Sequence, residues 1–452
     1  MTLGRFGRLT DPPASFLVTD VRVIDPNDGS DAVRDLAVID GFLADPGNAS
    51  DRIERIDGRG LVAAPGFCDL HTHLREPGDD VSETIACGAR AAARGGFTTI
   101  CAMPNTEPPL DEPARLAWVI DRARDASCRV RVIGTVTVGR RGEALADLAA
   151  MADAGAVGFS DDGAAIPSSR LTRSALTYLR GVGRPLIEHA EDGQLADGSE
   201  MRAGPTASRL GLRGWAPSAE LTVVERDIAL AEETGGRLHV THLSTAAALE
   251  AIRRARSRGL PVTCDVTPHH LAMTDAWVAG SRRFAWQEPD DEVSLDVDHA
   301  FDGLCRVNPP LPSRADALAL LSGLADGTID AIATDHAPHP AERKLVPFGE
   351  ASPGMIGLET ALGIGLAAVE AGCLDLARLI AALSIRPAEI ISERRSLAIG
   401  QPADLVVFDP AARGPVTSDQ LASASSNTPL LGVELPGMVR LTVANGRITY
   451  RS

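Results

Sequence analysis

Short apolar segments alternate with alanine- and leucine-rich segments from residue 61 onward, and this alternation restricts the possible folds more than any other feature. The apolar segments have the length of strands. The segments between them have the composition of helices, and several end at a glycine. Repeated strand–helix units predict an α/β chain with a parallel (β/α)8 TIM barrel over residues 63–395. The predicted strands end at Asp69, Ala102, Thr135, Phe159, Glu188, Thr241, Val266 and Thr334.

The two ends of the chain have a different pattern. Residues 16–62 and 396–452 alternate short β-rich runs with Pro, Asn, Asp and Gly turns. We predict that these segments pair into one small β-sandwich module beside the barrel, and that residues 1–15 form a flexible tail. Residues 282–299 form an acidic insertion in the barrel segment, which suits a solvated surface loop or, as the alternative, a lid.

Composition excludes several classes of partner. The 452 residues include 44 basic and 61 acidic side chains, a formal net charge of −17, which argues against nucleic acid or an anionic membrane surface. The sequence contains no apolar run of about 18 residues that would predict a membrane span, and its polar start lacks the core of a signal peptide. The seven scattered cysteines favour reduced thiols, so we expect a cytoplasmic protein.

The first predicted barrel strand ends in a His-x-His pair, His71 and His73. Side chains two residues apart on a strand point to the same face, so both imidazoles suit one divalent transition metal ion. Arg75 follows in the same register and puts a permanent positive charge beside that position, as an anionic substrate needs. An isolated His-x-His pair fits packed or exposed histidines equally well, so the other strand ends have to decide.

Most histidines fall at predicted strand ends. Nine of the ten lie there, where barrel enzymes carry their catalytic residues, and His299 alone lies elsewhere. Carboxylates join them, because an Asp-Asp-Gly tripeptide, which also suits a plain turn, follows the fourth strand and Asp335 follows the eighth. This set is enough for two metals sharing one bridging water, whose proton Asp335 would pass to a leaving nitrogen. The residues are His71, His73, His189, His242, Asp335 and one aspartate of the tripeptide.

Seven motifs extend this set of residues along the chain. The motifs are Asp69-Leu70-His71-Thr72-His73-Leu74-Arg75-Glu76-Pro77-Gly78, Met103-Pro104-Asn105-Thr106, Phe159-Ser160-Asp161-Asp162-Gly163, Glu188-His189-Ala190-Glu191-Asp192, His242-Leu243-Ser244-Thr245, Arg306-Val307-Asn308-Pro309-Pro310 and Ala333-Thr334-Asp335-His336-Ala337-Pro338-His339. Together they resemble the motifs of class I dihydroorotases, in the amidohydrolase superfamily, and the resemblance runs from about Phe16 to Tyr450. His71-Thr72-His73 alone would indicate only the superfamily.

The resemblance implies zinc-dependent, reversible closure of N-carbamoyl-L-aspartate to (S)-dihydroorotate with loss of water, a step of de novo pyrimidine biosynthesis. It implies two zinc ions bridged by Asp162 and a water or hydroxide, with Asp335 as general base and acid. In many relatives a carboxylated lysine bridges the metals, but the only lysine here, Lys344, lies beyond the eighth strand. The implied ligands are His71, His73 and Asp335 for one ion and His189 and His242 for the other; the implied substrate-binding residues are Arg75, Asn105, Asn308, His339, Pro353 and Gly354.

Several alternatives stay open. The chain could be another cyclic amidase, of the hydantoinase or allantoinase type, or a non-catalytic dihydroorotase-like subunit that scaffolds aspartate carbamoyltransferase. We expect a homo-oligomer, and leave open whether the chain associates with aspartate carbamoyltransferase and whether one metal or two is bound at rest. We expect His239 to pack in the core or to support a metal ligand. His269 and His270 could have structural roles or roles in the site. Asp69 is expected to hold the ring of a ligand histidine.

Overall fold

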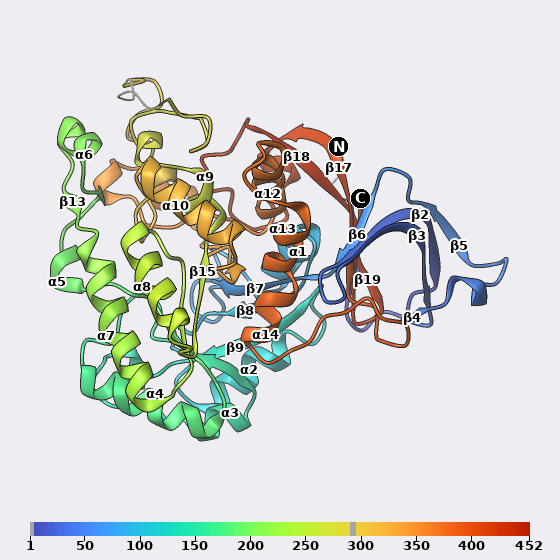
Figure 1. Ribbon diagram of the computed structural model, residues 1–452, viewed down its shortest axis with the longest axis horizontal. Helices are drawn as coiled ribbons and strands as arrows, with labels where there is room; N and C mark the ends of the chain where they lie inside the picture. The colour runs from blue at the N-terminus through green and yellow to red at the C-terminus, as the bar shows by residue number, and fades with distance from the viewer. Residues whose placement is uncertain (1–3, 290–294) are drawn as a thin grey trace.

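A computed structural model describes residues 4–289 and 295–452. Over these residues the chain forms an eight-stranded parallel sheet, a nine-stranded mixed sheet and a small two-stranded sheet (Figure 1). The first is a nearly closed barrel and confirms the predicted (β/α)8 fold. Its strands are β7 (Phe67–Thr72), β8 (Phe97–Ala102), β9 (Arg129–Gly134), β10 (Ala156–Phe159), β11 (Leu186–Glu188), β14 (Leu238–Val240), β15 (Val262–Val266) and β16 (Ala331–Ile332).

Helices cover the outside of the barrel, as expected when each strand is followed by a crossover helix (Figure 1). Their ends follow local rules. The Ser168 hydroxyl caps the start of α4 and Gly183 ends it with a left-handed φ of 74°. The helices are α1 (Ile85–Arg94), α2 (Pro113–Arg122), α3 (Leu148–Asp153), α4 (Ser169–Val182), α5 (Gly193–Ala196), α6 (Pro205–Leu210), α7 (Ser218–Thr234), α8 (Ala246–Ser257), α9 (Pro268–Ala272), α10 (Arg314–Ala325), α11 (Ala341–Lys344), α12 (Ala361–Glu370), α13 (Leu376–Leu383) and α14 (Ile385–Ile390).

Contacts at the carboxyl end of the barrel join its first strand to the segment after its last. The backbone N–H of His73 donates to the carbonyl oxygen of His336 at 2.8 Å. The Asp69 carboxylate accepts the backbone N–H groups of Thr334, at 2.9 Å, and His71, at 3.2 Å. Asp69 therefore joins the backbone of the first barrel strand to the backbone of the segment after the last strand. The expectation that it holds a histidine ring is wrong.

The apolar run from Leu61 to Leu70, which holds the predicted end of the first barrel strand at Asp69, forms parts of two strands. β6 (Val62–Pro65) pairs with β2 (Phe16–Asp25) and β17 (Leu405–Pro415) in the mixed sheet, whereas β7 opens the barrel. Gly66 lies at the break, where a Cβ atom would come within 2.3 Å of the Thr98 side chain. The chain passes from one sheet to the other at a point where backbone and side chain are too close for any larger residue.

The terminal segments form one continuous, curled mixed sheet beside the barrel (Figure 1). It encloses its own apolar core, which includes Phe16, Leu405 and Val443. The expectation of a flexible tail is wrong for Arg5 and Phe6, because β1 (Arg5–Phe6) pairs with β19 and Phe6 packs on Tyr450 with ring centroids 5.4 Å apart. The remaining strands of this sheet are β3 (Ser30–Ile39), β4 (Phe42–Ala44), β5 (Glu54–Asp57), β18 (Glu434–Ala444) and β19 (Arg447–Arg451), and the two-stranded sheet pairs β12 (Met201–Arg202) with β13 (Gly214–Trp215).

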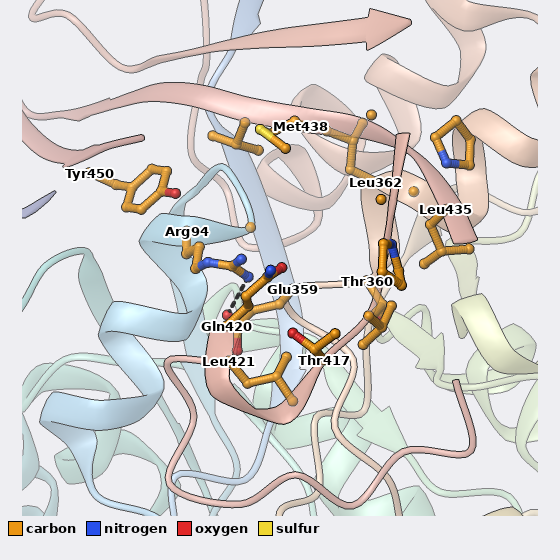
Figure 2. A pocket seen from close by; sticks show the side chains of 18 residues that line it. Arg94, Glu359, Thr360, Leu362, Thr417, Gln420, Leu421, Leu435, Met438 and Tyr450 are labelled. Carbon is orange, nitrogen blue, oxygen red and sulfur yellow. Dashed lines mark hydrogen bonds and ion pairs between the residues drawn. The ribbon is translucent and has the colours of Figure 1, made fainter. Parts of the chain in front are cut away.

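A cavity of about 130 Å³ lies where the barrel meets the terminal sheet (Figure 2). It is lined by Arg94 at the end of α1, by Met438 of β18 and by Tyr450 of β19. Inside it, the buried carboxylate of Glu359 accepts a hydrogen bond from Arg94 Nη1 at 2.8 Å. This buried ion pair lies at the junction of the two sheets.

The acidic insertion is packed at residues 284–288 and exposed to solvent at residues 295–299, so the expectation of a solvated loop holds for only part of it. Phe284 is 6% exposed and stacks on Trp277, with ring centroids 6.2 Å apart. The guanidinium of Arg282 lies over the Trp277 ring, 5.3 Å from its centroid. Residues 290–294 of the insertion lie outside the described residues.

The fold bears on the state of the cysteines and on membrane spans. Each of the seven cysteines, all within the described ranges, is a free thiol. In the part of the chain that the structure covers, the helices are too short or too polar to cross a membrane.

Candidate active site

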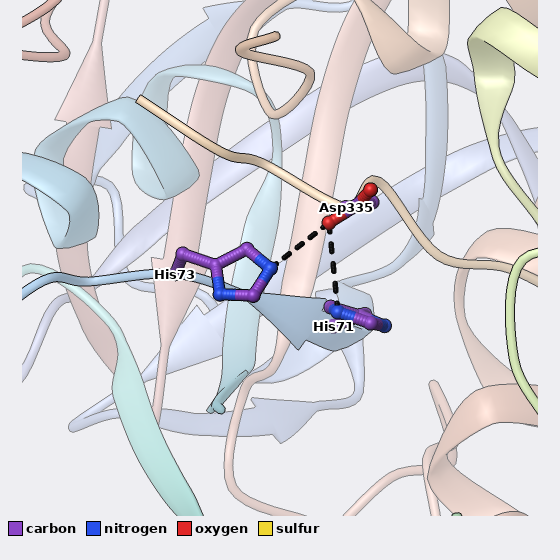
Figure 3. Close-up of side chains that lie close together, drawn as sticks. All are labelled: His71, His73 and Asp335. Carbon is purple, nitrogen blue, oxygen red and sulfur yellow. Dashed lines mark hydrogen bonds and ion pairs between the residues drawn. The ribbon is translucent and has the colours of Figure 1, made fainter. Parts of the chain in front are cut away.

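Six buried side chains meet at the carboxyl end of the barrel. They come from the ends of β7, β10, β11, β14 and β16, so residues up to 264 positions apart in the sequence become neighbours because parallel strands end on the same rim. Figure 3 shows three of them, with the Asp335 carboxylate facing the rings of His71 and His73. The six are His71, His73, Asp162, His189, His242 and Asp335, and we call them the cage.

Asp335 faces the two histidines of the first strand. Its Oδ1 atom lies 3.0 Å from His73 Nε2 and 3.5 Å from His71 Nε2. Two ligands held about 2.1 Å from a tetrahedral ion lie about 3.4 Å apart, so these separations suit coordination of a single cation.

Asp162 lies in the middle of the cage. Its Oδ1 atom is 3.3 Å from His71 Nε2, 3.7 Å from His189 Nδ1 and 3.9 Å from His242 Nε2. Its Oδ2 atom is 3.6 Å from His73 Nε2. The carboxylate thus lies within 3.9 Å of all four imidazoles, so it can be a ligand shared by two ions.

Unpartnered polar atoms show that the cage suits a cation. His71 Nε2 and Asp162 Oδ1 are buried without a hydrogen-bond partner among the described residues. Leaving two such atoms unsatisfied costs free energy unless something binds them. Two overlapping sets of three residues place one ligand atom each within 4.8 Å of the others: His71, His73 and Asp335, and His71, Asp162 and His242.

The charges of the cage favour a positive centre. Burial disfavours the imidazolium form of His71, but the carboxylates of Asp162 and Asp335 outweigh burial and raise the pKa of His71 to about 10. Burial likewise disfavours the Asp162 carboxylate, but the neighbouring His71 holds the pKa of Asp162 well below its usual range. The same field that attracts a proton would attract a metal ion.

Asp265, which was not predicted as a site residue, holds two parts of the cage through hydrogen bonds. The ring of His71 contacts Thr241 Oγ1 through Nδ1 at 2.9 Å, and Thr241 Oγ1 donates to Asp265 Oδ2 at 3.1 Å. Asp265 Oδ1 accepts the backbone N–H of His242 at 2.6 Å, and its Oδ2 contacts His239 Nε2 at 2.8 Å. A carboxylate within the apolar strand β15 was the available sequence signal. His239 therefore supports Asp265, because its two ring nitrogens contact Asp265 and Thr263.

The two aspartates of the Asp-Asp-Gly tripeptide have different surroundings. Asp161 accepts the backbone N–H groups of Val136 and Thr137 at 2.9 and 3.0 Å, so it fixes the loop after β9. Asp162 points into the cage, where its Oδ2 accepts Asn105 Nδ2 at 3.2 Å. Asn105 also contacts His73 Nδ1 at 2.9 Å. Asn105 therefore contacts two members of the cage, Asp162 and His73.

Arg75 and His339 lie together at the mouth of the cage. Arg75 Nε donates to the carbonyl oxygen of Pro338 at 3.3 Å, and its Nη2 lies 3.3 Å from His339 Nε2. His339 Nε2 lies 2.9 Å from the carbonyl oxygen of Pro353, to which it donates. Burial, with Arg75 beside it, lowers the pKa of His339 to about 3, so the ring is neutral. Its Nδ1 atom is then an acceptor, and it is buried without a partner among the described residues.

Asn308 and Pro353 line a cavity of about 180 Å³ beside the cage. Asn308 Nδ2 lies 3.4 Å from His189 Nε2 and 3.4 Å from Glu191 Oε1, so it connects the cage to this cavity. Gly354 has a φ of +129°, and a Cβ atom there would come within 2.7 Å of Ala337, so a larger residue is excluded.

His269 and His270 follow β15 and differ in their contacts. His270 lies 2.9 Å from the carbonyl oxygen of Pro309 through Nε2 and 2.8 Å from Thr267 Oγ1 through Nδ1, so both ring nitrogens are engaged in holding the loop before and after it. His269 is buried, and its Nε2 atom has no partner among the described residues.

Known proteins resemble the chain over almost its whole length. A family model described as dihydro-orotase-like matches residues 60–248. A dihydroorotase of Anaeromyxobacter sp. (strain K) is 46% identical over 437 residues, which cover 95% of this chain and 96% of the relative. A dihydroorotase of Pelobacter propionicus is 41% identical and the match covers 97% of this chain and 100% of the relative. The chain belongs to the dihydroorotase family.

Solved structures agree with this membership at the level of the fold. An L-hydantoinase (dihydropyrimidinase) from Arthrobacter aurescens superposes with a TM-score of 0.83 and 25% sequence identity over 97% of this chain and 96% of that chain. A dihydropyrimidinase from Brevibacillus agri, at 21% identity and a TM-score of 0.78, shares the fold. The dihydroorotase family member described here is thus a cyclic amide hydrolase on an amidohydrolase barrel.

Proposed function

We propose that the protein is a dihydroorotase that interconverts N-carbamoyl-L-aspartate and (S)-dihydroorotate in de novo pyrimidine biosynthesis. The observation that carries the proposal is the Asp162 carboxylate, which lies within 3.9 Å of four imidazoles. The full-length similarity to dihydroorotases supports the same activity.

The site residues have separate roles in ring opening, where water adds to an amide carbonyl and the carbon–nitrogen bond breaks. A metal held in the cage would polarise that carbonyl and lower the pKa of the attacking water. Asp335 takes the proton of the water and returns it to the leaving nitrogen, and ring closure reverses the two transfers. Arg75 pairs with a substrate carboxylate, and the Nδ1 acceptor of His339 is available to a substrate N–H group.

We assign zinc to the cage because four imidazoles and two carboxylates suit that ion. Two ions per chain are proposed, with Asp162 and a water or hydroxide between them. The remaining assignments follow the class I pattern of the family. The proposed ligands are His71, His73, Asp162, His189, His242 and Asp335, and the proposed substrate-binding residues are Arg75, Asn105, Asn308, His339, Pro353 and Gly354.

Lys344 cannot take the part of a bridging carboxylated lysine, because its Nζ atom donates to three backbone carbonyls. An aspartate bridge and the cation at Arg75 favour dihydroorotase over a hydantoin or allantoin hydrolase. A non-catalytic scaffold has no need of a complete cage with unpartnered ligand atoms.

The proposal also covers the assembly of the protein, its location and its domains. We propose a cytoplasmic homo-oligomer that can associate with aspartate carbamoyltransferase. We also propose that the barrel unit begins after Pro65, and not at residue 63, because β6 lies in the mixed sheet. Residues 16–65 and 396–452 then form the flanking β module, and the barrel unit ends at residue 395.

A turnover assay tests the proposal. The zinc-loaded protein should interconvert N-carbamoyl-L-aspartate and dihydroorotate, with hydantoin and allantoin turned over at least 100-fold more slowly. Asp335→Asn should abolish turnover while the zinc content falls by less than half. A folded, zinc-loaded sample without turnover would count against dihydroorotase activity, and preference for hydantoin or allantoin would favour the second candidate.

A further inference from the structure

The chain has a single lysine, Lys344, and it is buried. All other members of its 44 basic residues are arginine. Lys344 ends the short helix α11 and is 1% exposed. A buried ammonium is costly to desolvate, and burial lowers the pKa of Lys344 to about 7. A side chain this unfavourable to bury needs strong partners.

The partners are three backbone carbonyl oxygens from two loops. Lys344 Nζ donates to Ser352 at 2.7 Å, to Gly354 at 2.9 Å and to Arg306 at 3.1 Å. The three N–H groups of an ammonium point to the corners of a tetrahedron and match three converging acceptors. No nitrogen of a guanidinium carries three N–H groups, so an arginine cannot donate to three acceptors from one atom, which explains why this position is a lysine in a chain that otherwise uses arginine.

Both loops that Lys344 joins line the cavity beside the cage. Arg306 and Asn308 of one loop and Pro353 of the other all line this cavity of about 180 Å³. The loop around Pro353 is held at three successive carbonyls, because His339 Nε2 donates to Pro353 between the two that Lys344 holds. The Gly354 N–H also donates to the Arg306 carbonyl at 2.9 Å.

We propose that Lys344 is a positioning residue, whose ammonium fixes the distance between the Arg306–Asn308 loop and the Ser352–Gly354 loop and thereby the substrate site between them. This role rests on the proposed function, because Asn308, Pro353 and Gly354 are its substrate-binding residues. Lys344 itself touches backbone and not substrate.

The test compares three variants with the wild-type enzyme. Lys344→Met removes the ammonium, and Lys344→Arg keeps the charge without the three-way geometry. Arg378→Met is the matched control, because Arg378 also donates to backbone carbonyls, those of Leu324, Ile329 and Asp330, before the amino end of β16. KM, kcat, zinc per chain and the melting temperature are measured for each.

Lys344→Met should raise KM for N-carbamoyl-aspartate at least tenfold, with zinc content unchanged and a smaller change in kcat. Lys344→Arg should not restore KM, whereas Arg378→Met should lose thermal stability and keep KM within twofold of the wild type. A folded Lys344→Met enzyme with KM within twofold of the wild type overturns the proposal. So does a loss of zinc that accounts for the change in KM.

A second measurement needs no variant. Selective ¹³C labelling of lysine gives one side-chain signal, from Lys344, in the zinc-loaded wild-type protein. The signal should shift when N-carbamoyl-aspartate is added to saturation, and an unchanged signal overturns the positioning role. A wild-type enzyme without turnover would instead count against the proposed function, so the two failures are distinguishable.

Discussion

Asp162 and Asp161 are adjacent in sequence and have opposite tasks. The Asp162 carboxylate faces the cage, and the Asp161 carboxylate accepts backbone N–H groups of Val136 and Thr137. Both residues lie in the loop after β10, and their side chains leave it toward different partners. These two positions therefore provide a test and its control within one dipeptide.

Asp162→Asn should lower turnover on the order of 100-fold or more and reduce the bound zinc, because a neutral amide is a poor ligand for two cations. Asp161→Asn should lower stability but retain zinc. Metal analysis and turnover of both purified variants check the expectation. Full zinc content in Asp162→Asn would contradict the bridging assignment.

Glu220 gives the folded state a pH dependence. It is buried, accepts the backbone N–H and hydroxyl of Ser244 at 2.8 and 2.9 Å, and burial raises its pKa to about 7. Its usual pKa is about 4.3, so between these values the folded state binds the proton and the unfolded state releases it. Stability from this group is therefore present at low pH and is lost as the pH rises from about 4.3 to about 7.

Replacing Glu220 by Gln should remove this slope. The free energy of unfolding of the wild type, relative to Glu220→Gln, should fall by about 1–3 kcal/mol between pH 5 and pH 8, since one pKa unit corresponds to about 1.4 kcal/mol. Urea titrations at several pH values measure the difference. Parallel pH profiles for the two proteins would show that Glu220 does not titrate in this range.

At the scale of elements, α1 is joined to the loop that carries Arg75. Glu76 follows Arg75 and is 5% exposed; its Oε2 accepts the N–H of Ile85 at the start of α1 at 2.9 Å, and its Oε1 accepts Arg122 Nε of α2 at 2.8 Å. A carboxylate suits the amino end of a helix, where N–H groups lack partners. One side chain thus connects two helices to the mouth of the cage.

Glu76→Ala should lower the free energy of unfolding by about 1–3 kcal/mol, because it leaves a buried helix-end N–H unpaired, and should raise KM by loosening Arg75. Arg122→Ala is the control. The Arg122 side chain is 60% exposed, and an exposed partner contributes about 0–1 kcal/mol. Chemical denaturation and kinetics are measured for both variants. Equal effects would show that the stability comes from the Glu76–Arg122 ion pair and not from the hydrogen bond to Ile85.

At the scale of the molecule, the cage joins five strand ends of the barrel. A ligand that binds only the folded state stabilises it by about 2.7 kcal/mol at 100 times its Kd. Removing zinc with a chelator should therefore lower the melting temperature by roughly 5 °C or more, and adding zinc back should restore it. Calorimetry with Asp162→Asn as the control should show a smaller chelator effect. An equal melting temperature with and without metal would argue against the cage as the zinc site.

Much of the fold follows from local patterns. The alternation of strands and helices predicts the barrel, because periodicity and length are local properties of the chain. The boundaries were less accurate where two sheets meet, since the run around Gly66 is uniformly apolar and gives no sign that β6 and β7 belong to different sheets. Likewise, nothing in residues 1–15 signals that Arg5 and Phe6 pair with a strand more than 440 positions away.

The sequence by itself determined which residues could serve as ligands and at which strand ends they lie, because residue type and position in the repeat are written in the chain. Only the tertiary structure decided that Asp162 faces four imidazoles, that Asp265 supports His71 and His242, and that Lys344 joins two loops. These contacts depend on the closure of the barrel, which brings distant segments within a few ångströms. No local pattern encodes such distances.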